Sequence, residues 1–209
     1  MLVYKLTDQN FKTFNDTIWG ENVTHKTSGE SVLCTDGWLH YYHHPILAIL
    51  LNPIHANIEN PILWKAKAEG KHLDDHGLKG GCTKLTTIKQ ITIPIISPEQ
   101  KIKFAILSTK KVCNHHQWNQ WADNWLSGKD RSKKSAKNAC LLMEHMHNSD
   151  DVAQWISSFA ASHAAQAVIY MNNPLFDEHI ANSIGEAARA AHFFKHHKLL
   201  DTILKQVFH

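Results

Sequence analysis

The chain has 209 residues, of which 43% are hydrophobic, and a formal net charge of +3 with the histidines neutral. This composition supports a folded core and excludes wholesale disorder, and so small a charge does not by itself indicate a nucleic-acid-binding protein. The apolar run from Pro45 to Leu51 is far too short to span a bilayer, and the N-terminal segment lacks a secretory pattern. We therefore expect a soluble, cytoplasmic protein that does not act in a membrane.

Cysteine and histidine spacing gives no recognisable metal motif. The four cysteines are scattered without a C-x-x-C pair, which predicts reduced thiols. There are 17 histidines, but His43 and His44 are adjacent, and His192 and His196 supply only two ligands four residues apart. Because a protein zinc site needs at least three convergent ligands, we expect no metal ion, and no motif indicates another cofactor.

Residues 1–96 are predicted to form a mixed α/β module. The segment "LVYKL" at 2–6 is short and rich in residues that favour strands. The segment "KLTTIKQITIPI" at 84–95 is rich in Thr and Ile and also predicts a strand, and Pro94 places the end of that strand at a sheet edge.

The segment "LWKAKAEG" at 63–70 alternates with the period of a strand. Trp64, Ala66 and Ala68 share one face, and Leu63 shares the other face with two lysines. Such an alternation is typical of a strand with one face against a core.

The segment "GWLHYYHHPILAILL" at 37–51 predicts a strand that turns into a buried helix. In a strand, His40 and Tyr42 share one face, and the two following histidines lie at the turn. Pro45 suits the first position of a helix, and the apolar run after it predicts that this helix is buried.

The pattern changes at "SPEQ", residues 97–100. Ser97 as N-cap, Pro98 at the first helical position and Gln100 completing a capping box predict a helix start. Residues 97–209 carry few strand signals, and we predict an all-helical domain there.

The predicted helices of 97–209 have apolar positions at helical spacing. The first stripe is formed by Trp118, Trp121 and Trp125, and we interpret it as core. The segments "NSDD" at 148–151 and "NNP" at 172–174 predict two further helix starts. We expect four or five packed helices, and the whole chain is predicted to be α+β, with a small N-terminal sheet module followed by a helical bundle or array.

Four segments occur in a fixed order: "VYK" at 3–5, "GWLHYYHHP" at 37–45, "LWKAKAEGK" at 63–71 and "KLTTIKQI" at 84–91. Together they resemble an uncharacterised family of phages and bacteria, whose N-terminal module has a Tyr-Lys strand, a Gly-x-x-His element before a proline, and an alanine-rich helical C-terminal extension. The segment "WADNWLSGKDRS" at 121–132 is similar to that extension. The resemblance implies a phage, mobile-element or bacterial origin and supplies no established activity.

The stretch from Gly37 to Ala48 also resembles the ADP-ribosyltransferase fold, in which a G-x-[HY] strand precedes a helix. That resemblance implies an NAD-using cleft, with Lys5, His40 and Glu69 as candidate catalytic residues. The sequence departs from the pattern because it has no Ser-Thr-Ser strand. His40 has two interpretations: a group that binds substrate or acts as a general base, or a histidine satisfied within the core.

The segment "GKDRSKKSAK" at 128–137 concentrates positive charge at a predicted helix start, where Asp130 or Ser132 can act as the cap. Cations at this end of a helix oppose its dipole, and an acidic partner such as a phosphate, a nucleic-acid backbone or a carboxylate patch would offset the cost. The other interpretation is an ordinary solubilising surface. The candidate binding residues are Lys129, Arg131, Lys133, Lys134 and Lys137.

Three functional hypotheses follow from these patterns. The first is a non-enzymatic binding protein of phage or mobile-element type, which binds a bacterial host protein or complex and antagonises a host defence system, as an anti-CRISPR protein does. The second is an NAD-using enzyme with an ADP-ribosyltransferase-like N-terminal module. The third is a nucleic-acid-binding protein that uses the basic segment 129–137.

Overall fold

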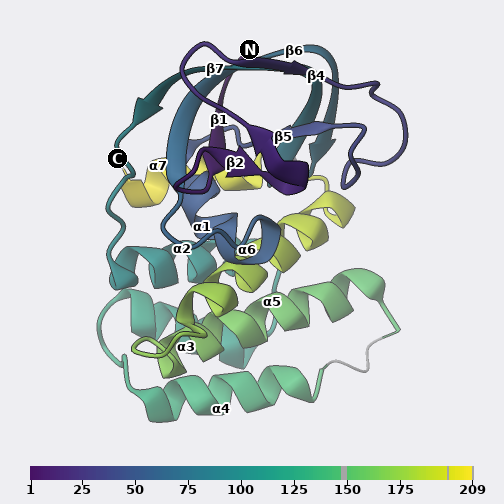
Figure 1. Ribbon diagram of the computed structural model, residues 1–209. Coiled ribbons are helices and arrows are strands. Elements are labelled where there is room, and N and C mark those ends of the chain that lie inside the picture. Colours follow the sequence, from purple (N-terminus) through teal and green to yellow (C-terminus); the bar gives the residue numbers. More distant parts are fainter. Residues whose placement is uncertain (147–149, 197, 209) are drawn as a thin grey trace. The chain divides into compact units, whose positions relative to one another are not determined.

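The computed structural model describes residues 1–146, 150–196 and 198–208, and it confirms the α+β class. An antiparallel sheet is followed along the chain by a series of helices (Figure 1). The chain divides into two compact units, Met1–Ile95 and Ile96–His209. Each unit buries its own set of apolar side chains.

The N-terminal unit is built on a five-stranded sheet. Strands β1, β6, β7 and β4 lie side by side in that order, β5 also pairs with β7, and a separate hairpin joins β2 to β3. All of these pairings are antiparallel. The strands are β1 (Leu2–Thr7), β2 (Lys12–Thr13), β3 (Thr17–Ile18), β4 (Thr24–Lys26), β5 (Leu39–Tyr41), β6 (Ile62–Asp75) and β7 (Lys79–Ile91).

The strands predicted at 2–6 and 63–70 are confirmed as β1 and as part of the longer β6. Trp64, Ala66 and Ala68 are buried, as their alternation predicts. Leu63 differs from the expectation, because it is also fully buried although it lies on the opposite face. Both faces of β6 are therefore covered at the end where it begins.

The strand predicted at 84–95 is wrong at both ends. Strand β7 begins at Lys79 and ends at Ile91, and Ile95 is 98% exposed. The register explains the end, because Ile91 lies opposite Leu63 near the beginning of β6, and later residues have no strand to pair with. The alternating isoleucines beyond that point therefore belong to the connection that leads to the helical unit.

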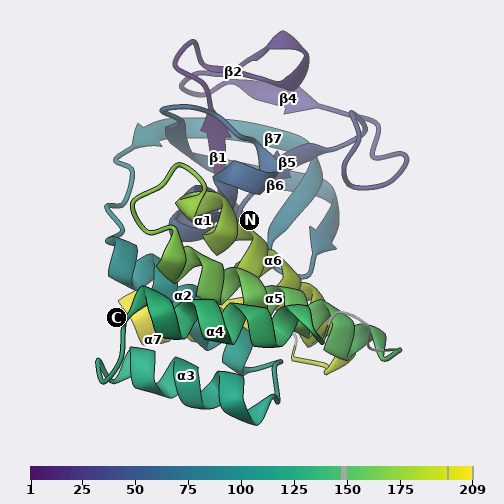
Figure 2. The ribbon, with the colours of Figure 1, turned by 90° about the horizontal axis from the view of Figure 1, so that it is seen from below.

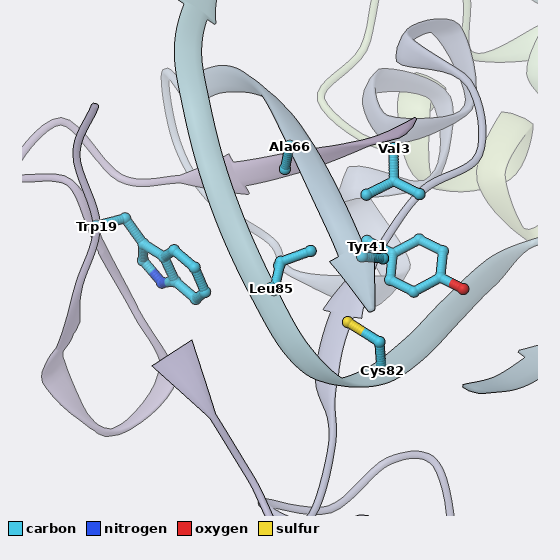
Figure 3. Packing of buried hydrophobic residues seen from close by; sticks show 7 residues of the cluster. Val3, Trp19, Tyr41, Ala66, Cys82 and Leu85 are labelled. Atoms are coloured by element: carbon cyan, nitrogen blue, oxygen red, sulfur yellow. The ribbon is translucent and has the colours of Figure 1, made fainter. Parts of the chain in front are cut away.

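Side chains from three paired strands meet in the core of the N-terminal unit. Figure 3 shows Val3 of β1, Tyr41 of β5 and Leu85 of β7 around the same buried region, with Trp19 entering from outside the sheet. The closeness of β5 and β7 depends on Gly80, because a Cβ atom there would lie 2.4 Å from the Tyr41 ring. The small side chains at the centre are Ala66, Ala68 and Cys82.

The segment 37–51 folds as predicted. Strand β5 leads to helix α1 (Pro45–His55), in which Pro45 takes the first helical position. The His44 side chain caps this helix, because its Nδ1 accepts a hydrogen bond from the Ile46 backbone N–H at 3.2 Å. The apolar run after Pro45 is mostly buried, and the helix continues as far as His55.

The described residues of the second unit form helices and the turns that connect them, and no strand. Six helices occur there, one more than the upper end of the expected range, and Figure 2 shows α4 running alongside α5. None of the helices in the described chain is both long and apolar enough to cross a membrane. The helices are α2 (Pro98–Lys110), α3 (His116–Leu126), α4 (Lys133–Glu144), α5 (Val152–Ile169), α6 (Phe176–Phe193) and α7 (Leu199–Phe208).

The first helix start of this unit is confirmed in full. The Ser97 side chain accepts from the Gln100 backbone N–H at 3.2 Å, and the Gln100 side chain accepts from the Ser97 N–H at 2.9 Å. At the predicted start 148–151, Asp151 caps α5, whereas residues 148 and 149 lie outside the described residues.

The helix start predicted at Asn173 and Pro174 is wrong, because α6 begins at Phe176. The Asn173 carboxamide oxygen accepts from the Leu175 N–H at 3.0 Å, and its carbonyl oxygen accepts from the Phe176 N–H at 2.9 Å. Asn173 therefore caps a turn that precedes the helix.

The tryptophan stripe is confirmed as core, since Trp118, Trp121 and Trp125 are all buried. The Trp118 indole N–H donates to the Ala161 carbonyl oxygen at 3.0 Å, which joins α3 to α5. Helices α5 and α6 pack closely through buried alanines, of which Ala160 and Ala187 are fully buried examples. Small side chains at these positions let the two backbones approach each other.

Candidate functional site

The N-terminal unit contains a hollow of about 980 Å³. Its wall is formed by β1, β5, the β2–β3 hairpin and the loop that precedes β5. Both charged and aromatic side chains line it, which suits a ligand or a partner segment with polar and apolar parts. Residues used below include Lys5, Phe14, Trp19, Trp38, His40 and Lys79.

Lys5 lies at the wall of this hollow and is only 7% exposed. Its ammonium group donates to the His40 carbonyl oxygen at 3.1 Å and lies 4.6 Å from the centroid of the Trp19 ring. Burial lowers the pKa of Lys5 to about 8, because the charged form loses its hydration. No carboxylate forms an ion pair with Lys5 within the described residues.

His40 lines the same hollow, and its ring is already hydrogen-bonded. The ring Nε2 pairs with the Leu33 carbonyl oxygen, so this nitrogen is protonated and donates. Burial lowers the pKa of His40, and the nearby positive charges of Lys5 and Lys79 lower it further. The hydrogen bond to Leu33 fixes the orientation of this half-buried imidazole at the wall of the hollow.

Glu69 is not among the residues that line the hollow. It lies on β6 opposite Lys84 of β7, and its carboxylate forms ion pairs at 3.1 Å with both Lys67 and Lys84. Hydrogen bonds from Lys67 and Lys84 lower the pKa of Glu69 and hold it in the charged form. The structure therefore brings Lys5 and His40 together and places Glu69 elsewhere on the sheet.

The β2–β3 hairpin forms a rim of the hollow that the sequence analysis missed. Asn15 and Asp16 at its tip have φ angles of 58° and 53°, a left-handed conformation that Asn and Asp tolerate better than most residues. The Asn-Asp pair, flanked on both sides by residues that favour strands, is the sequence signal from which this hairpin could have been predicted. Phe14 and Ile18 of the hairpin are 81% and 60% exposed.

Trp19 anchors this hairpin to the sheet. Its ring is buried in the core cluster with Val3 and Leu85, and its indole N–H donates to Thr13 Oγ1 at 2.9 Å. The Trp19 backbone N–H donates to the Phe11 carbonyl oxygen at 2.7 Å. The hairpin is thus fixed at its base, while Phe14 near its tip is exposed to solvent.

The cations of the basic segment 129–137 fall into two groups, one that is paired within its own unit and one that is exposed. Arg131 is engaged within its own unit: it pairs with Glu99 at 2.8 Å, and its Nε donates to the Trp125 carbonyl oxygen at 3.0 Å. Ser132 is the cap of α4, one of the two residues predicted for that role. The remaining cations are exposed around the start of α4, and we call them the α4 lysines: Lys129, Lys133, Lys134 and Lys137.

Metal-ligating side chains do not gather in groups of three or more anywhere in 1–146, 150–196 or 198–208. His43 is hydrogen-bonded to Asp74 at 2.9 Å, and this bond lowers the pKa of Asp74. No protein-family model, curated protein or solved structure matches the chain. The function is therefore inferred from the geometry of the hollow, the hairpin and the α4 lysines.

Proposed function

We propose that the protein is a non-enzymatic binding protein that docks a partner protein on the β2–β3 hairpin and the hollow behind it. The observation that supports this proposal is the pair of exposed apolar side chains on the hairpin, Phe14 near its tip and Ile18 at its base, next to the buried anchor Trp19. Large apolar side chains fixed in solvent beside a concave surface are typical of protein interfaces. The resemblance to phage and bacterial proteins favours a bacterial host protein as the partner, with a host defence complex such as a CRISPR effector as the target class.

The placement of the candidate catalytic residues favours a binding protein over an NAD-using enzyme. An ADP-ribosyl transfer develops positive charge on the ribose, and a carboxylate in the cleft normally stabilises it. Glu69, the residue considered for that role, is paired with two lysines outside the hollow. Lys5 and His40 remain there without it, and both make hydrogen bonds to backbone carbonyl groups.

The hairpin can be tested by charge introduction. The double variant Phe14→Asp/Ile18→Asp should weaken partner binding by at least about thirtyfold, since the loss of even one central apolar anchor typically costs about 2 kcal/mol or more. Immobilised wild-type protein would first be used to capture proteins from a bacterial lysate for identification by mass spectrometry. The identified protein would then be purified, and its affinity for each variant measured by calorimetry.

Ile95→Asp is the matched control, because Ile95 belongs to the same unit and is 98% exposed but lies outside the hairpin and the hollow. It should bind like the wild type. Equal binding by the hairpin variant and the wild type would refute docking at the hairpin. Release of nicotinamide from NAD by the purified protein, lost in Glu69→Gln, would instead favour the enzyme hypothesis.

A nucleic acid is the second candidate partner, and the α4 lysines are the observation that favours it. They are exposed, none forms a salt bridge within the described chain, and no acidic residue occupies the first turn of α4. The substitution of all four α4 lysines by Glu should abolish nucleic-acid binding, and wild-type affinity should fall steeply with salt because phosphate contacts release counterions. Fluorescence anisotropy with labelled DNA and RNA would measure both effects.

The control for this second experiment reverses the same number of exposed lysines at other positions. It should retain most of the affinity if the α4 lysines form the site. Binding that is insensitive to salt, or an equal loss in both variants, would remove the nucleic-acid hypothesis. The control lysines are Lys26, Lys71, Lys89 and Lys205.

A further inference from the structure

The buried ammonium group of Lys5 is the most unusual charge in the N-terminal unit. It has one hydrogen bond, to the His40 carbonyl oxygen, and one ring contact, to Trp19. A buried charge is costly unless it is paired and fully hydrogen-bonded, and an ammonium group has three protons to donate. Lys5 therefore has donor capacity and positive charge that the described chain does not use.

Lys79 adds a second positive charge to the same wall. It begins β7, lines the hollow and forms no ion pair within the described residues. Lys5 and Lys79 both lie close enough to His40 to lower its pKa, so the two charges act on one part of the wall. Because its pKa is lowered, His40 adds no charge of its own to this part of the wall at neutral pH.

Three carboxylates also line the wall, but none of them forms an ion pair with Lys5 or Lys79 within the described residues. Asp8 accepts from the backbone N–H groups of Asn10 and Lys12 at 2.9 and 2.7 Å, so its oxygens stabilise a turn. Asp16 pairs with Lys12 at 3.1 Å across the hairpin tip. Asp36 is the remaining acidic residue of the lining, and it is exposed.

A hydroxyl group in the lining also lacks a partner. Thr27 Oγ1 is buried and makes no hydrogen bond within the described structure. A buried polar atom without a hydrogen-bond partner is destabilising, and a ligand in the hollow would supply the missing partner.

We propose that the hollow of the N-terminal unit is a binding site for a small anionic ligand, whose carboxylate or phosphate group is bound by Lys5 and Lys79. The ammonium group of Lys5 supplies a buried charge-assisted hydrogen bond, and Lys79 supplies the second cation nearer to solvent. This inference rests on the proposed function in one respect, since it uses the same hollow as the binding surface. It adds the chemical class of the ligand that the hollow binds.

The experiment uses the full chain and four probes: inorganic phosphate and adenosine monophosphate for the phosphate group, and acetate and benzoate for the carboxylate group. Affinity would be measured by calorimetry, and the midpoint of thermal unfolding would be measured at matched ionic strength. Matching matters because phosphate stabilises proteins in general by exclusion from their surface. At least one probe should bind the wild type and raise its midpoint above that in sodium chloride.

Lys5→Met should weaken binding of that probe by about tenfold or more, since a hydrogen bond to a charged group is lost. Lys79→Met should weaken it by a smaller factor and serves as the second variant if Lys5→Met does not fold. Lys89→Met, which removes an exposed lysine of β7 outside the hollow, should bind like the wild type. Circular dichroism would establish that each variant is folded.

Absence of binding for all four probes would overturn the inference, as would equal affinities for Lys5→Met, Lys79→Met and Lys89→Met. A phosphate preference or a carboxylate preference would each support it and identify the source of the charge. The two proposals fail separately: hairpin variants that lose the partner protein while no anion binds would refute this inference alone. Anion binding lost in Lys5→Met, with partner binding unaffected by the hairpin substitutions, would refute the docking proposal alone.

Discussion

Replacing Trp118 with alanine is expected to lower the free energy of unfolding of the helical unit by about 3–5 kcal/mol. Trp118 is fully buried on α3, and its indole N–H donates to the Ala161 carbonyl oxygen on α5. The substitution leaves a large cavity between helices and removes a buried donor at the same time. The substitution removes both the packing of the ring and its hydrogen bond, so the loss of stability should be near the upper end of the range for core substitutions.

Trp155→Ala is the matched control for Trp118→Ala. Trp155 lies on α5 but is 42% exposed, and its ring contacts Phe159 within the same helix. Its removal should cost about 1 kcal/mol, which is typical of a partly exposed site. Unfolding in urea, followed by far-ultraviolet circular dichroism, would compare the two. Similar losses for both variants would contradict the assignment of Trp118 to the core.

The free energy of unfolding of the wild type, measured relative to that of Lys5→Met, should rise by about 2.5 kcal/mol between pH 7 and pH 10. The pKa of Lys5 is about 8 in the folded protein, against an ordinary value of 10.5 that applies when the chain is unfolded. Between these two values the unfolded chain binds more protons than the folded one, so the stability of the fold increases with pH. Below pH 8 the full cost of burying the ammonium group is present.

Chemical unfolding of both proteins at several pH values would measure this difference. Taking the difference between the proteins removes most of the contribution of other groups, such as Tyr41 and Tyr42, whose pKa values are raised by burial. Lys89→Met is the control, and its difference from the wild type should not change with pH in this range. A constant difference for Lys5→Met would show that Lys5 is hydrated in the folded protein.

Local patterns were sufficient to predict the elements whose signals lie within a few residues of each other. The capping box at Ser97, the helix that starts at Pro45 and the stripe through Trp118 all formed as predicted. Each of these features depends on backbone hydrogen bonds or side-chain spacing inside a single element. The fold class followed, because the change from alternation to helical spacing was visible in the sequence.

The parts that were wrong or missed depend on contacts between distant segments. The end of β7 at Ile91 is set by where β6 begins, and the position of Glu69 opposite Lys84 is set by the register of the same two strands. The hairpin strands β2 and β3 have two residues each, which is too short for periodicity to show. The burial of Lys5 is determined by Trp19, which reaches it only in the folded unit.

The long β6–β7 hairpin imposes an order of assembly during synthesis. Strands β4 and β5 are made before β7, the strand with which both pair, whereas β1 pairs with β6 and forms a bridge from Tyr4 to Tyr42 after β5. A chain emerging from the ribosome with its N-terminus first therefore leaves β4 and β5 without their partner strand until β7 has left the exit tunnel, whereas β1 can pair with β6 before that. Once β7 has emerged, it can form the local β6–β7 hairpin, and β4 and β5 can then pair with β7 in either order.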